Sequence, residues 1–226
     1  MQVLSIESQK KLAAQKAISF IENGMTVGLG TGSTAKYAIE LISQKVASGL
    51  KITTVATSLE TEKLAKSLGL EIQNDFTKID LTIDGADKVD VLGNIIKGGG
   101  GALTREKIVA KNSEKFIVII DESKLADTLK GSYLPVEILP FAFRATIKEI
   151  TKIIPEVKLR NAGQKLFVTD NGNFIVDCQL QDISNLSSLD TILKQISGVI
   201  ENGLFLNLAA SVIVGKADET TRELIF

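Results

Sequence analysis

The sequence contains no histidine, no tryptophan and a single cysteine, Cys178. Without histidine, the chain cannot form a Ser–His–Asp or Cys–His catalytic group, an imidazole proton shuttle or a histidine-bearing zinc site. One cysteine excludes an internal disulfide framework, so we expect a reducing, cytoplasmic setting, and we expect Cys178 to be a buried small hydrophobe. If the protein is an enzyme, carboxylates, lysines, tyrosines or that thiol must carry its acid–base chemistry.

A strong net charge and long apolar runs are also missing. The 26 basic and 27 acidic residues give a net charge of −1, which provides no electrostatic basis for binding nucleic acid or an anionic membrane. No apolar run approaches the roughly 20 residues that span a bilayer, and residues 1–16 do not resemble a signal peptide. Any bound anion must therefore be held by a local site.

Helical and strand patterns alternate along the first two thirds of the 226 residues. Short apolar or β-branched runs predict strands at 25–29, 51–56, 79–83 and 116–120. The spacing of apolar residues and the capping residues predict helices at 8–22, about 31–47, 58–69 and about 102–111. This order predicts an α/β fold with a Rossmann-like, mostly parallel twisted sheet and helices on both faces.

The pattern changes after Pro135. Strands are expected at 136–139, 165–169 and 174–178, and helices at 147–154 and about 189–196. Asn171-Gly172 predicts a hairpin that joins the second and third of these strands. These elements predict a smaller α+β domain, of the ferredoxin-like type, and the last strands, 204–208 and 211–214, are expected to rejoin the first sheet. The predicted division is a catalytic domain at 1–130 and 204–226 and a small domain at 131–203, expected at an oligomer interface.

Four polar or glycine-rich segments follow expected strands, at the edge where open α/β sheets bind ligands. They are 28–34 (GLGTGST), 84–87 (DGAD), 97–101 (KGGGG) with Glu106 beyond it, and 121–124 (DESK). The convergence of these segments on one edge predicts the position of the site.

The first segment favours a small phosphate ester. Glycines let the backbone approach a ligand, and hydroxyl and N–H groups at a helix N-terminus suit a phosphate. Ser33 replaces the third glycine of the dinucleotide fingerprint, and the Walker lysine is missing, so a nucleotide-dependent enzyme is disfavoured. A tight turn before a capped helix is the alternative.

Paired carboxylates and a glycine loop supply the predicted reactive groups. Asp84 and Asp87 are expected to hold hydroxyls and exchange protons, with an Asx turn or a magnesium site as alternatives. Lys97 places a cation at the edge of the four glycines, and Glu106 lies in the first turns of the next helix. The charged neighbours of Glu106 also fit an exposed helix face, and Lys124 is either a second cation for a phosphate or a surface residue.

In this order and spacing, the segments resemble the type A ribose-5-phosphate isomerases. The similarity covers nearly the whole chain and rests on GLGTGST, DGAD, KGGGGALTREK at 97–107, DESK and VTDNGN at 168–173. It implies interconversion of D-ribose 5-phosphate and D-ribulose 5-phosphate in the non-oxidative pentose phosphate pathway. It also implies that there is no cofactor or metal and that the protein is a homodimer or a dimer of dimers.

Carried onto this chain, the resemblance makes Glu106 the base that transfers a proton through a cis-enediolate. Asp84 or Asp87 is expected to assist ring opening, and Lys97 to stabilise the oxyanion. Lys10 is expected to face the phosphate. The implied substrate-binding residues are Thr31, Gly32, Ser33, Thr34, Asp84, Gly85, Ala86, Asp87, Lys97, Gly98, Gly99, Gly100 and Lys124. One departure from the family pattern is Lys88, which stands where an acidic residue commonly follows DGAD.

Two other functions remain open at this point. A sugar-phosphate sensor would keep the phosphate loop but would not need Glu106 together with both aspartates. An acyl-CoA transferase of related sheet architecture would need a nucleophilic carboxylate and a pocket for a nucleotide-bearing thioester.

Overall fold

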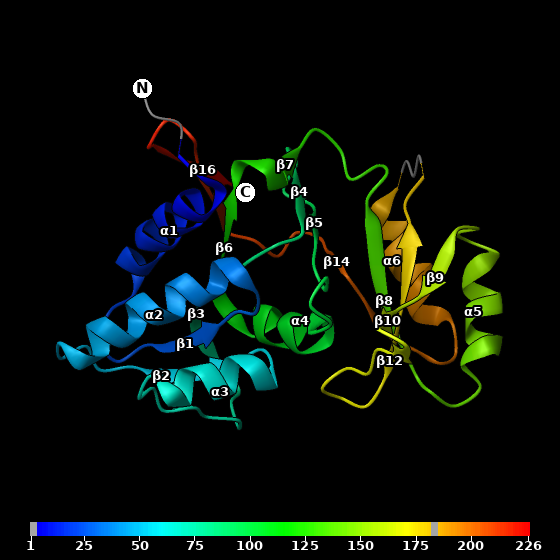
Figure 1. The fold of residues 1–226 in the computed structure, drawn as a ribbon, viewed down its shortest axis with the longest axis horizontal. Coiled ribbons are helices and arrows are strands. Elements are labelled where there is room, and N and C mark those ends of the chain that lie inside the picture. The colour runs from blue at the N-terminus through cyan, green and yellow to red at the C-terminus, as the bar shows by residue number, and fades with distance from the viewer. Residues whose placement is uncertain (1–3, 182–184) are drawn as a thin grey trace.

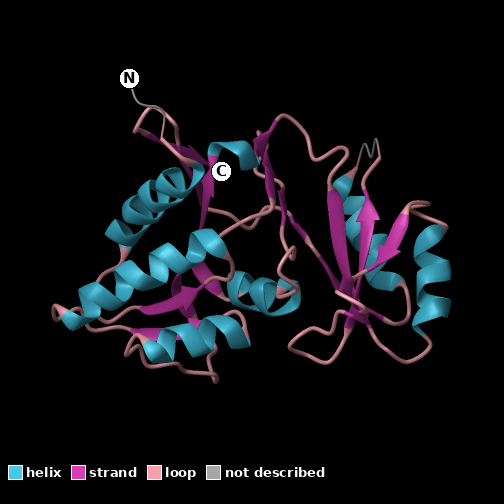
Figure 2. Ribbon diagram, in the orientation of Figure 1, coloured by secondary structure: helices cyan, strands magenta, loops and turns pink. Residues whose placement is uncertain are grey.

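The computed structural model of the chain describes residues 4–181 and 185–226, which form two lobes (Figure 1). The larger lobe contains a six-stranded sheet surrounded by helices, and the smaller contains a four-stranded antiparallel sheet (Figure 2). The chain builds most of the larger lobe, crosses to the smaller one and then returns for its last strands. Among the described residues, no helix has the length and apolarity that crossing a bilayer requires.

The main sheet has the strand order β16-β15-β6-β3-β1-β2. All neighbouring strands are parallel except β15 and β16, which pair antiparallel. The bounds are β1 Thr26–Leu29, β2 Thr53–Ala56, β3 Ile79–Asp84, β6 Ser113–Asp121, β15 Ser211–Gly215 and β16 Thr221–Ile225.

Alternation along the central strand β6 shows how both faces of the sheet are buried. Ile117 and Ile119 pack in a core with residues of α1, α2 and α3. Phe116, Val118 and Ile120 face the other way. They pack in a core shared with α4 and with an additional four-stranded sheet of the larger lobe. The prediction of a Rossmann-like, mostly parallel sheet with helices on both faces is therefore confirmed. The helices are α1 Ile6–Ala17, followed by η1 Ile18–Phe20, α2 Ser33–Ala47, α3 Leu59–Ser67 and α4 Leu103–Lys111.

This additional sheet packs on the same face of the main sheet as α4. Its strand order is β14-β5-β4-β7. Its strands are β4 Lys88–Asp90, β5 Ile95–Ile96, β7 Leu125–Ala126 and β14 Leu204–Phe205, and η2 Glu122–Lys124 precedes β7. The expectation that 204–208 rejoins the first sheet is wrong, because β14 is only two residues long and pairs with β5. The strand expected at 211–214 does return, as β15 beside β6.

The smaller lobe is ferredoxin-like, as predicted. Its elements follow the order βαββαβ, and the sheet order β13-β8-β12-β9 is antiparallel throughout. Cys178 is buried in its core, where burial raises the pKa of the thiol to about 12. The limits of the two predicted domains stay a prediction. The elements are β8 Tyr133–Ile138, α5 Phe143–Thr151, β9 Val157–Leu159, β12 Phe174–Gln179, α6 Leu186–Gln195 and β13 Val199–Asn202.

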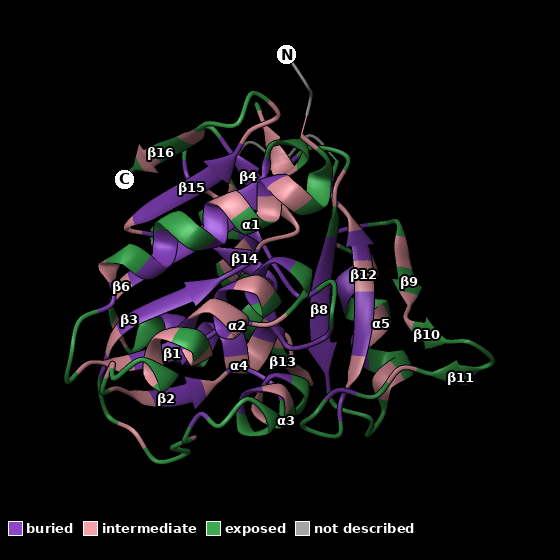
Figure 3. Cartoon of the chain, turned by 60° about the vertical axis from the view of Figure 1, so that its left-hand side comes forward, coloured by how far each residue is buried: buried purple, intermediate pink, exposed green. Residues whose placement is uncertain are grey.

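The predicted hairpin between 165–169 and 174–178 is wrong. The turn exists, since the N–H of Gly172 donates to the carbonyl of Thr169 at 2.9 Å. However, β8 and β9 already occupy both edges of β12, so the preceding segment cannot pair with it. It forms instead an exposed two-stranded ribbon, β10 (Asn161–Ala162) with β11 (Lys165–Leu166), which projects from the lobe (Figure 3).

Candidate active site

The polar segments after β1, β3 and β6 and the glycine loop before α4 meet at a cavity of about 150 Å³. Strand order turns between β1 and β3, and the carboxyl ends of the strands at such a turning point are where open α/β sheets bind ligands. Every residue predicted to bind substrate lines the cavity except Asp84. The lining residues are Lys10, Thr31, Gly32, Ser33, Thr34, Gly85, Ala86, Asp87, Lys97, Gly98, Gly99, Gly100, Glu106 and Lys124.

The loop between β1 and α2 brings a helix N-terminus to this cavity. Gly30 allows the loop to pass against Asp84, because a Cβ at this position would lie 2.2 Å from Asp84 Oδ1. Gly32 caps α2 with φ 103°, a left-handed conformation that favours glycine. Ser33 and Thr34 begin the helix, so their N–H and hydroxyl groups, together with the helix dipole, suit a phosphate.

A cluster of buried hydroxyls holds this loop from behind. Thr31 Oγ1 lies 2.7 Å from Thr57 Oγ1, 2.9 Å from Ser58 Oγ and 3.1 Å from Thr61 Oγ1. Thr57 and Ser58 lie in the segment that joins β2 to α3, and Thr61 lies in the first turn of α3. The cluster therefore fixes the loop between β1 and α2 relative to the neighbouring strand.

Asp84, at the end of β3, lies beneath the cavity and is fully buried. Its Oδ1 accepts hydrogen bonds from the N–H groups of Thr31, at 2.9 Å, and Gly85, at 2.7 Å. Its Oδ2 lies 3.1 Å from Lys97 Nζ. Burial raises the pKa of Asp84, while Lys97 and the two backbone donors oppose that rise. This geometry makes Asp84 a support for the loop and for Lys97.

Lys97 is a buried cation held between two carboxylates. Nζ donates to the Gly85 carbonyl at 2.5 Å and lies 3.1 Å from both Asp84 Oδ2 and Glu106 Oε1. Burial opposes the charge, but Asp84, Glu106 and Asp87 outweigh it and raise the pKa of Lys97 above its usual value. A fixed positive charge thus reaches the wall of the cavity.

Glu106 projects from the first turn of α4 and is only 4% exposed. Its Oε2 is buried and accepts no hydrogen bond from the residues that the structure describes. Burial raises the pKa of Glu106 to about 8; Lys97 opposes the rise, and Asp84 and Asp87 add to it. The alternative of an exposed helix face is wrong, since Lys107 is also buried, with Nζ 2.9 Å from Glu201 Oε1.

Asp87 and the glycine loop form another part of the cavity wall. The N–H of Gly99 donates to Asp87 Oδ2 at 2.6 Å, and a Cβ on Gly99 would lie 2.5 Å from Asp87 Oδ1. The loop is anchored at its start, where the N–H of Lys97 donates to the Gly203 carbonyl at 3.0 Å. Unlike Asp84, Asp87 lines the cavity.

Two further lysines face the cavity, Lys10 from α1 and Lys124 from η2. Lys10 Nζ lies 2.7 Å from Glu7 Oε1, so a neighbouring carboxylate orients it. The same helix supports the η2 turn, because Gln9 Oε1 accepts the N–H of Glu122 at 3.2 Å. Together with the α2 N-terminus, these lysines place positive charge on the cavity wall.

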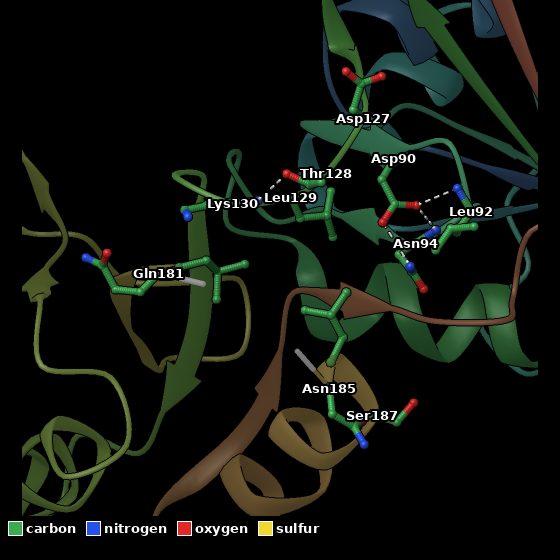
Figure 4. A pocket seen from close by; sticks show the side chains of 12 residues that line it. Asp90, Leu92, Asn94, Asp127, Thr128, Leu129, Lys130, Gln181, Asn185 and Ser187 are labelled. Atoms are coloured by element: carbon green, nitrogen blue, oxygen red, sulfur yellow. Dashed lines mark hydrogen bonds between the residues drawn. The ribbon is translucent and has the colours of Figure 1, made fainter. Parts of the chain in front are cut away.

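A second cavity, of about 360 Å³, lies between the β4–β5 turn and the start of α6 (Figure 4). The buried carboxylate on its wall, Asp90, accepts the N–H groups of Leu92 and Asn94, each at 2.9 Å, and closes its own turn. The predicted base, Glu106, lies at the smaller cavity, which is therefore the candidate site. Within residues 4–181 and 185–226, no group of three or more carboxylates or thiols is placed to hold a metal ion.

Sequence reasoning did not identify the residues of the smaller lobe that contact the site. Arg160 reaches carbonyls of the glycine loop, and Glu137 accepts a hydrogen bond from Thr104, two residues before Glu106. No local pattern marks either residue, because their partners lie far away in the sequence. The VTDNGN segment at 168–173 pointed to this part of the smaller lobe only in part. It contains Thr169, which also donates to Glu137.

The sequence profile of the family described as ribose 5-phosphate isomerase A (phosphoriboisomerase A) matches residues 53–219. Ribose-5-phosphate isomerase A of Thermoplasma volcanium is 47% identical over 216 residues, which cover 94% of this chain and 90% of that protein. The protein of the same name from Bacillus mycoides is 46% identical over 209 residues, covering 91% of this chain and 95% of that protein.

Solved structures give the same result. Ribose 5-phosphate isomerase from Plasmodium falciparum has a TM-score of 0.93 at 38% identity, covering 97% of this chain and 99% of that one. A D-ribose-5-phosphate isomerase in complex with phospho-erythronic acid has a TM-score of 0.93 at 39% identity, covering 99% of this chain and 100% of that one. By sequence and by fold, this chain belongs to the ribose 5-phosphate isomerase A family.

Proposed function

We propose that the chain interconverts D-ribose 5-phosphate and D-ribulose 5-phosphate, with Glu106 as the base that moves a proton between C2 and C1. The observation that carries this proposal is the state of the Glu106 carboxylate. One of its oxygens lies beside Lys97, and the other, at the wall of a polar cavity, is buried and has no hydrogen-bond partner among the described residues. A carboxylate held in this way is a strong base toward a carbon acid. Membership of the family supports the choice of substrate.

The substrate phosphate binds at the cation-rich end of the cavity. Ser33 and Thr34 offer the N-terminus of α2, and Lys124 and Lys10 supply positive charge. On this assignment, replacing Lys124 with Ala chiefly raises KM, whereas a pure kcat effect would move Lys124 to the reaction centre. The phosphate anchors the far end of the sugar, which holds C1 and C2 near Glu106.

We assign ring opening to Asp87. This carboxylate lines the cavity, whereas Asp84 is buried beneath it and is engaged by two N–H groups and Lys97. Asp87 moves a proton between the ring oxygen and the C1 hydroxyl, which releases the open-chain aldehyde. Asp84 acts indirectly, by holding Lys97 in place.

Proton transfer then follows on the aldehyde. Glu106 removes the C2 proton, the electron pair of that bond forms the C1–C2 double bond, and the C1 carbonyl becomes an oxyanion. Lys97 and N–H groups of the glycine loop stabilise this cis-enediolate. A proton passes from O2 to O1, C2 becomes the carbonyl carbon, and Glu106 returns its proton to C1.

We further propose that the chain forms a homodimer or a dimer of dimers through the small domain, 131–203. The support is an apolar groove between α5 and α6 in which Phe141 is 87% exposed and Ile192 44% exposed. Light scattering after size exclusion should give a multiple of the monomer mass, and Phe141→Ser should reduce it. A monomeric wild-type protein would contradict the proposal.

Proton NMR of the chelator-treated protein with D-ribose 5-phosphate in D₂O tests the reaction. Formation of ribulose 5-phosphate with deuterium at C1 would support proton transfer without a metal. Binding without conversion or exchange would contradict the isomerase function and would favour a sugar-phosphate sensor. Phospho-erythronic acid, bound in the related structure, carries a planar carboxylate that resembles the enediolate, and it should inhibit competitively.

A further inference from the structure

The glycine loop has no side chains of its own with which to hold a conformation. Gly98 and Gly101 adopt left-handed φ values of 100° and 87°, and Gly99 and Gly100 lie between them. A run of four glycines is entropically costly to order, whereas N–H groups stabilise an oxyanion well only if they are aimed before the reaction. The conformation must therefore be fixed by contacts from outside the loop.

Arg160 makes such contacts from the smaller lobe. Its Nη1 donates to the carbonyl of Gly98 at 2.8 Å and to the carbonyl of Gly99 at 3.0 Å. One guanidinium nitrogen thus holds two successive peptide groups of the loop. Because each carbonyl lies opposite the N–H of the next residue in its peptide plane, holding the carbonyls of Gly98 and Gly99 also orients the N–H groups of Gly99 and Gly100.

The guanidinium is itself fixed by a second residue of the lobe. Asp177 on β12 receives Arg160 Nε at 2.9 Å on one carboxylate oxygen and Nη2 on the other, so the pair is bidentate. The backbone of Arg160 is also held, since its N–H donates to Ile175 at 2.8 Å and its carbonyl accepts from Phe167 at 3.0 Å. Arg160 therefore reaches the loop from a rigid base.

The opposite side of the loop faces the substrate cavity. There Asp87 accepts the N–H of Gly99. Within the loop, the N–H of Gly101 donates at 2.9 Å to the Gly98 carbonyl, which Arg160 also binds. In the part of the chain that the structure describes, the N–H of Gly100 donates to no protein acceptor. Gly100 lines the cavity, so an N–H group free for an oxyanion belongs to a peptide that Arg160 holds by its carbonyl.

We propose that Arg160, oriented by Asp177, is a positioning residue that fixes the glycine loop for stabilisation of the enediolate. It acts on the loop's carbonyls and does not touch the substrate. This inference rests on the proposed isomerase function. It gives the smaller lobe a part in the reaction, because that lobe supplies both members of the bidentate pair.

Steady-state kinetics of Arg160→Met should show a fall in kcat of roughly 10–100-fold, with KM changed by less than about threefold. The kcat of Arg160→Lys should lie between those of wild type and Arg160→Met, because the lysine keeps the charge but its ammonium lacks the planar fork. Asp177→Asn should lower kcat by less than Arg160→Met. The double variant should be no worse than Arg160→Met alone, because both residues act through one contact.

Inhibition separates loop positioning from general damage. Phospho-erythronic acid should bind Arg160→Met more weakly by a factor similar to the loss in kcat, whereas inhibition by inorganic phosphate should stay within twofold. The rising limb of the kcat/KM pH profile should not move. Arg144→Met is the matched control, since Arg144 is exposed on α5 and packs over Phe143; it should retain wild-type kinetics.

A kcat for Arg160→Met within twofold of wild type would overturn the proposal. So would a parallel loss of inorganic phosphate binding, or a pH limb moved by about one unit, which would show that Arg160 acts through its charge. If Arg160→Met does not fold, Arg160→Lys and Asp177→Asn carry the same test. A wild-type protein without isomerase activity would instead refute the proposed function, so the two failures are distinguishable.

Discussion

At the scale of single residues, the site is a buried cluster in which Asp84 and Glu106 share the positive charge of Lys97. With both carboxylates ionised, the cluster carries one net negative charge, which burial disfavours. A proton that neutralises this charge belongs on Glu106, because Asp84 is stabilised by two N–H groups while Glu106 Oε2 accepts no bond within the described chain. Burial raises the pKa of both carboxylates, and the two N–H donors oppose this rise at Asp84.

The first prediction concerns Glu106→Gln. This substitution keeps the size of the side chain and removes the base, so we expect kcat to fall by roughly 10²–10⁴-fold while KM stays within a few-fold. The measurement is the initial rate of ribulose 5-phosphate formation, with a melting curve to show that the variant is folded. A variant that kept a tenth or more of the wild-type kcat would show that another group is the base.

The second prediction is the pH dependence of the wild type. A base acts in its deprotonated form, and kcat/KM reports ionisations of the free enzyme. Because burial raises the pKa of Glu106 to about 8, kcat/KM should rise with pH and level off above about 8. Rate profiles from pH 5 to 10 in buffers of constant ionic strength measure this limb. A rise in kcat/KM centred between pH 4 and 5 would indicate an unperturbed carboxylate. It would contradict the raised pKa that the burial of Glu106 predicts.

The third prediction is a cost in stability at the same residue. The folded pKa of Glu106 lies above its ordinary value of 4.5, so the native state retains a proton that the unfolded chain releases between pH 4.5 and about 8. Stability contributed by this proton is present below pH 4.5 and is lost as the pH rises to about 8. Glu106→Gln should thus gain a few kcal/mol over wild type across this window and keep that gain at higher pH. Melting temperatures of both proteins from pH 5 to 9 test this, and a constant difference would contradict it.

At the scale of elements, the loop between β1 and α2 depends on close approach to β3. A Cβ on Gly30 would lie 2.2 Å from Asp84 Oδ1 and 2.5 Å from Asp84 Cα, and the backbone cannot easily move away. We predict that Gly30→Ala destabilises the protein by roughly 3 kcal/mol or more and weakens phosphate binding. Gly85→Ala is the control, since its nearest atoms would lie 3.8 Å away. Denaturant unfolding measures the stability of both variants. Equal stabilities would show that the loop has room for a Cβ at position 30.

The elements that the sequence predicted are those with long, continuous patterns. The strands of the parallel sheet are β-branched or aliphatic runs, and Ser58 caps α3 as its position suggested. The strands β4, β5 and β7 were not predicted, because segments of two or three residues show no periodicity, and the strand predicted at 204–208 is shortened to β14, Leu204–Phe205. The edge strand β16 was missed because its sequence, TRELI, is mostly polar and its side chains are largely exposed.

The same limit applies to the site. Residues next to glycines at strand ends could be found, because that position has a local signature. The depth of Asp84 could not be predicted, because the DGAD pattern does not distinguish Asp84 from Asp87. Only the fold shows that Asp84 is buried beneath the cavity and that Asp87 lines it. Contacts such as that of Arg160 with Gly98 join residues 62 positions apart and leave no trace in local pattern.

At the scale of the whole molecule, the two lobes meet around α4 and the glycine loop. Lys107 on α4 donates to the carbonyl of Asn202 at 2.5 Å and pairs with Glu201 on β13. Arg160 holds the loop, and the chain around Lys97 is hydrogen-bonded to Gly203. The helix that carries Glu106 is therefore fixed by both lobes, and the geometry of this residue depends on their packing.

Glu137 is the buried centre of this contact. Its Oε1 accepts hydrogen bonds from Thr169 at 2.8 Å, Asn173 at 2.9 Å and Asn171 at 3.2 Å, and its Oε2 accepts one from Thr104 on α4. A glutamine would present an amide NH₂ to some of these donors and leave them unpaired. We predict that Glu137→Gln lowers stability by roughly 2–4 kcal/mol and lowers kcat, because α4 loses one of its attachments to the smaller lobe, the bond from Thr104.

Calorimetry and kinetics of the same samples test this coupling. Wild type should unfold in one transition, and Glu137→Gln should move that whole transition down by roughly 5–15 °C. Glu156→Gln is the matched control in the same lobe, since the Glu156 side chain is exposed and its replacement should change little. Two resolved transitions in wild type would mean that the lobes fold independently. In that case the position of Glu106 would be set by the larger lobe alone, and Glu137→Gln would leave kcat unchanged.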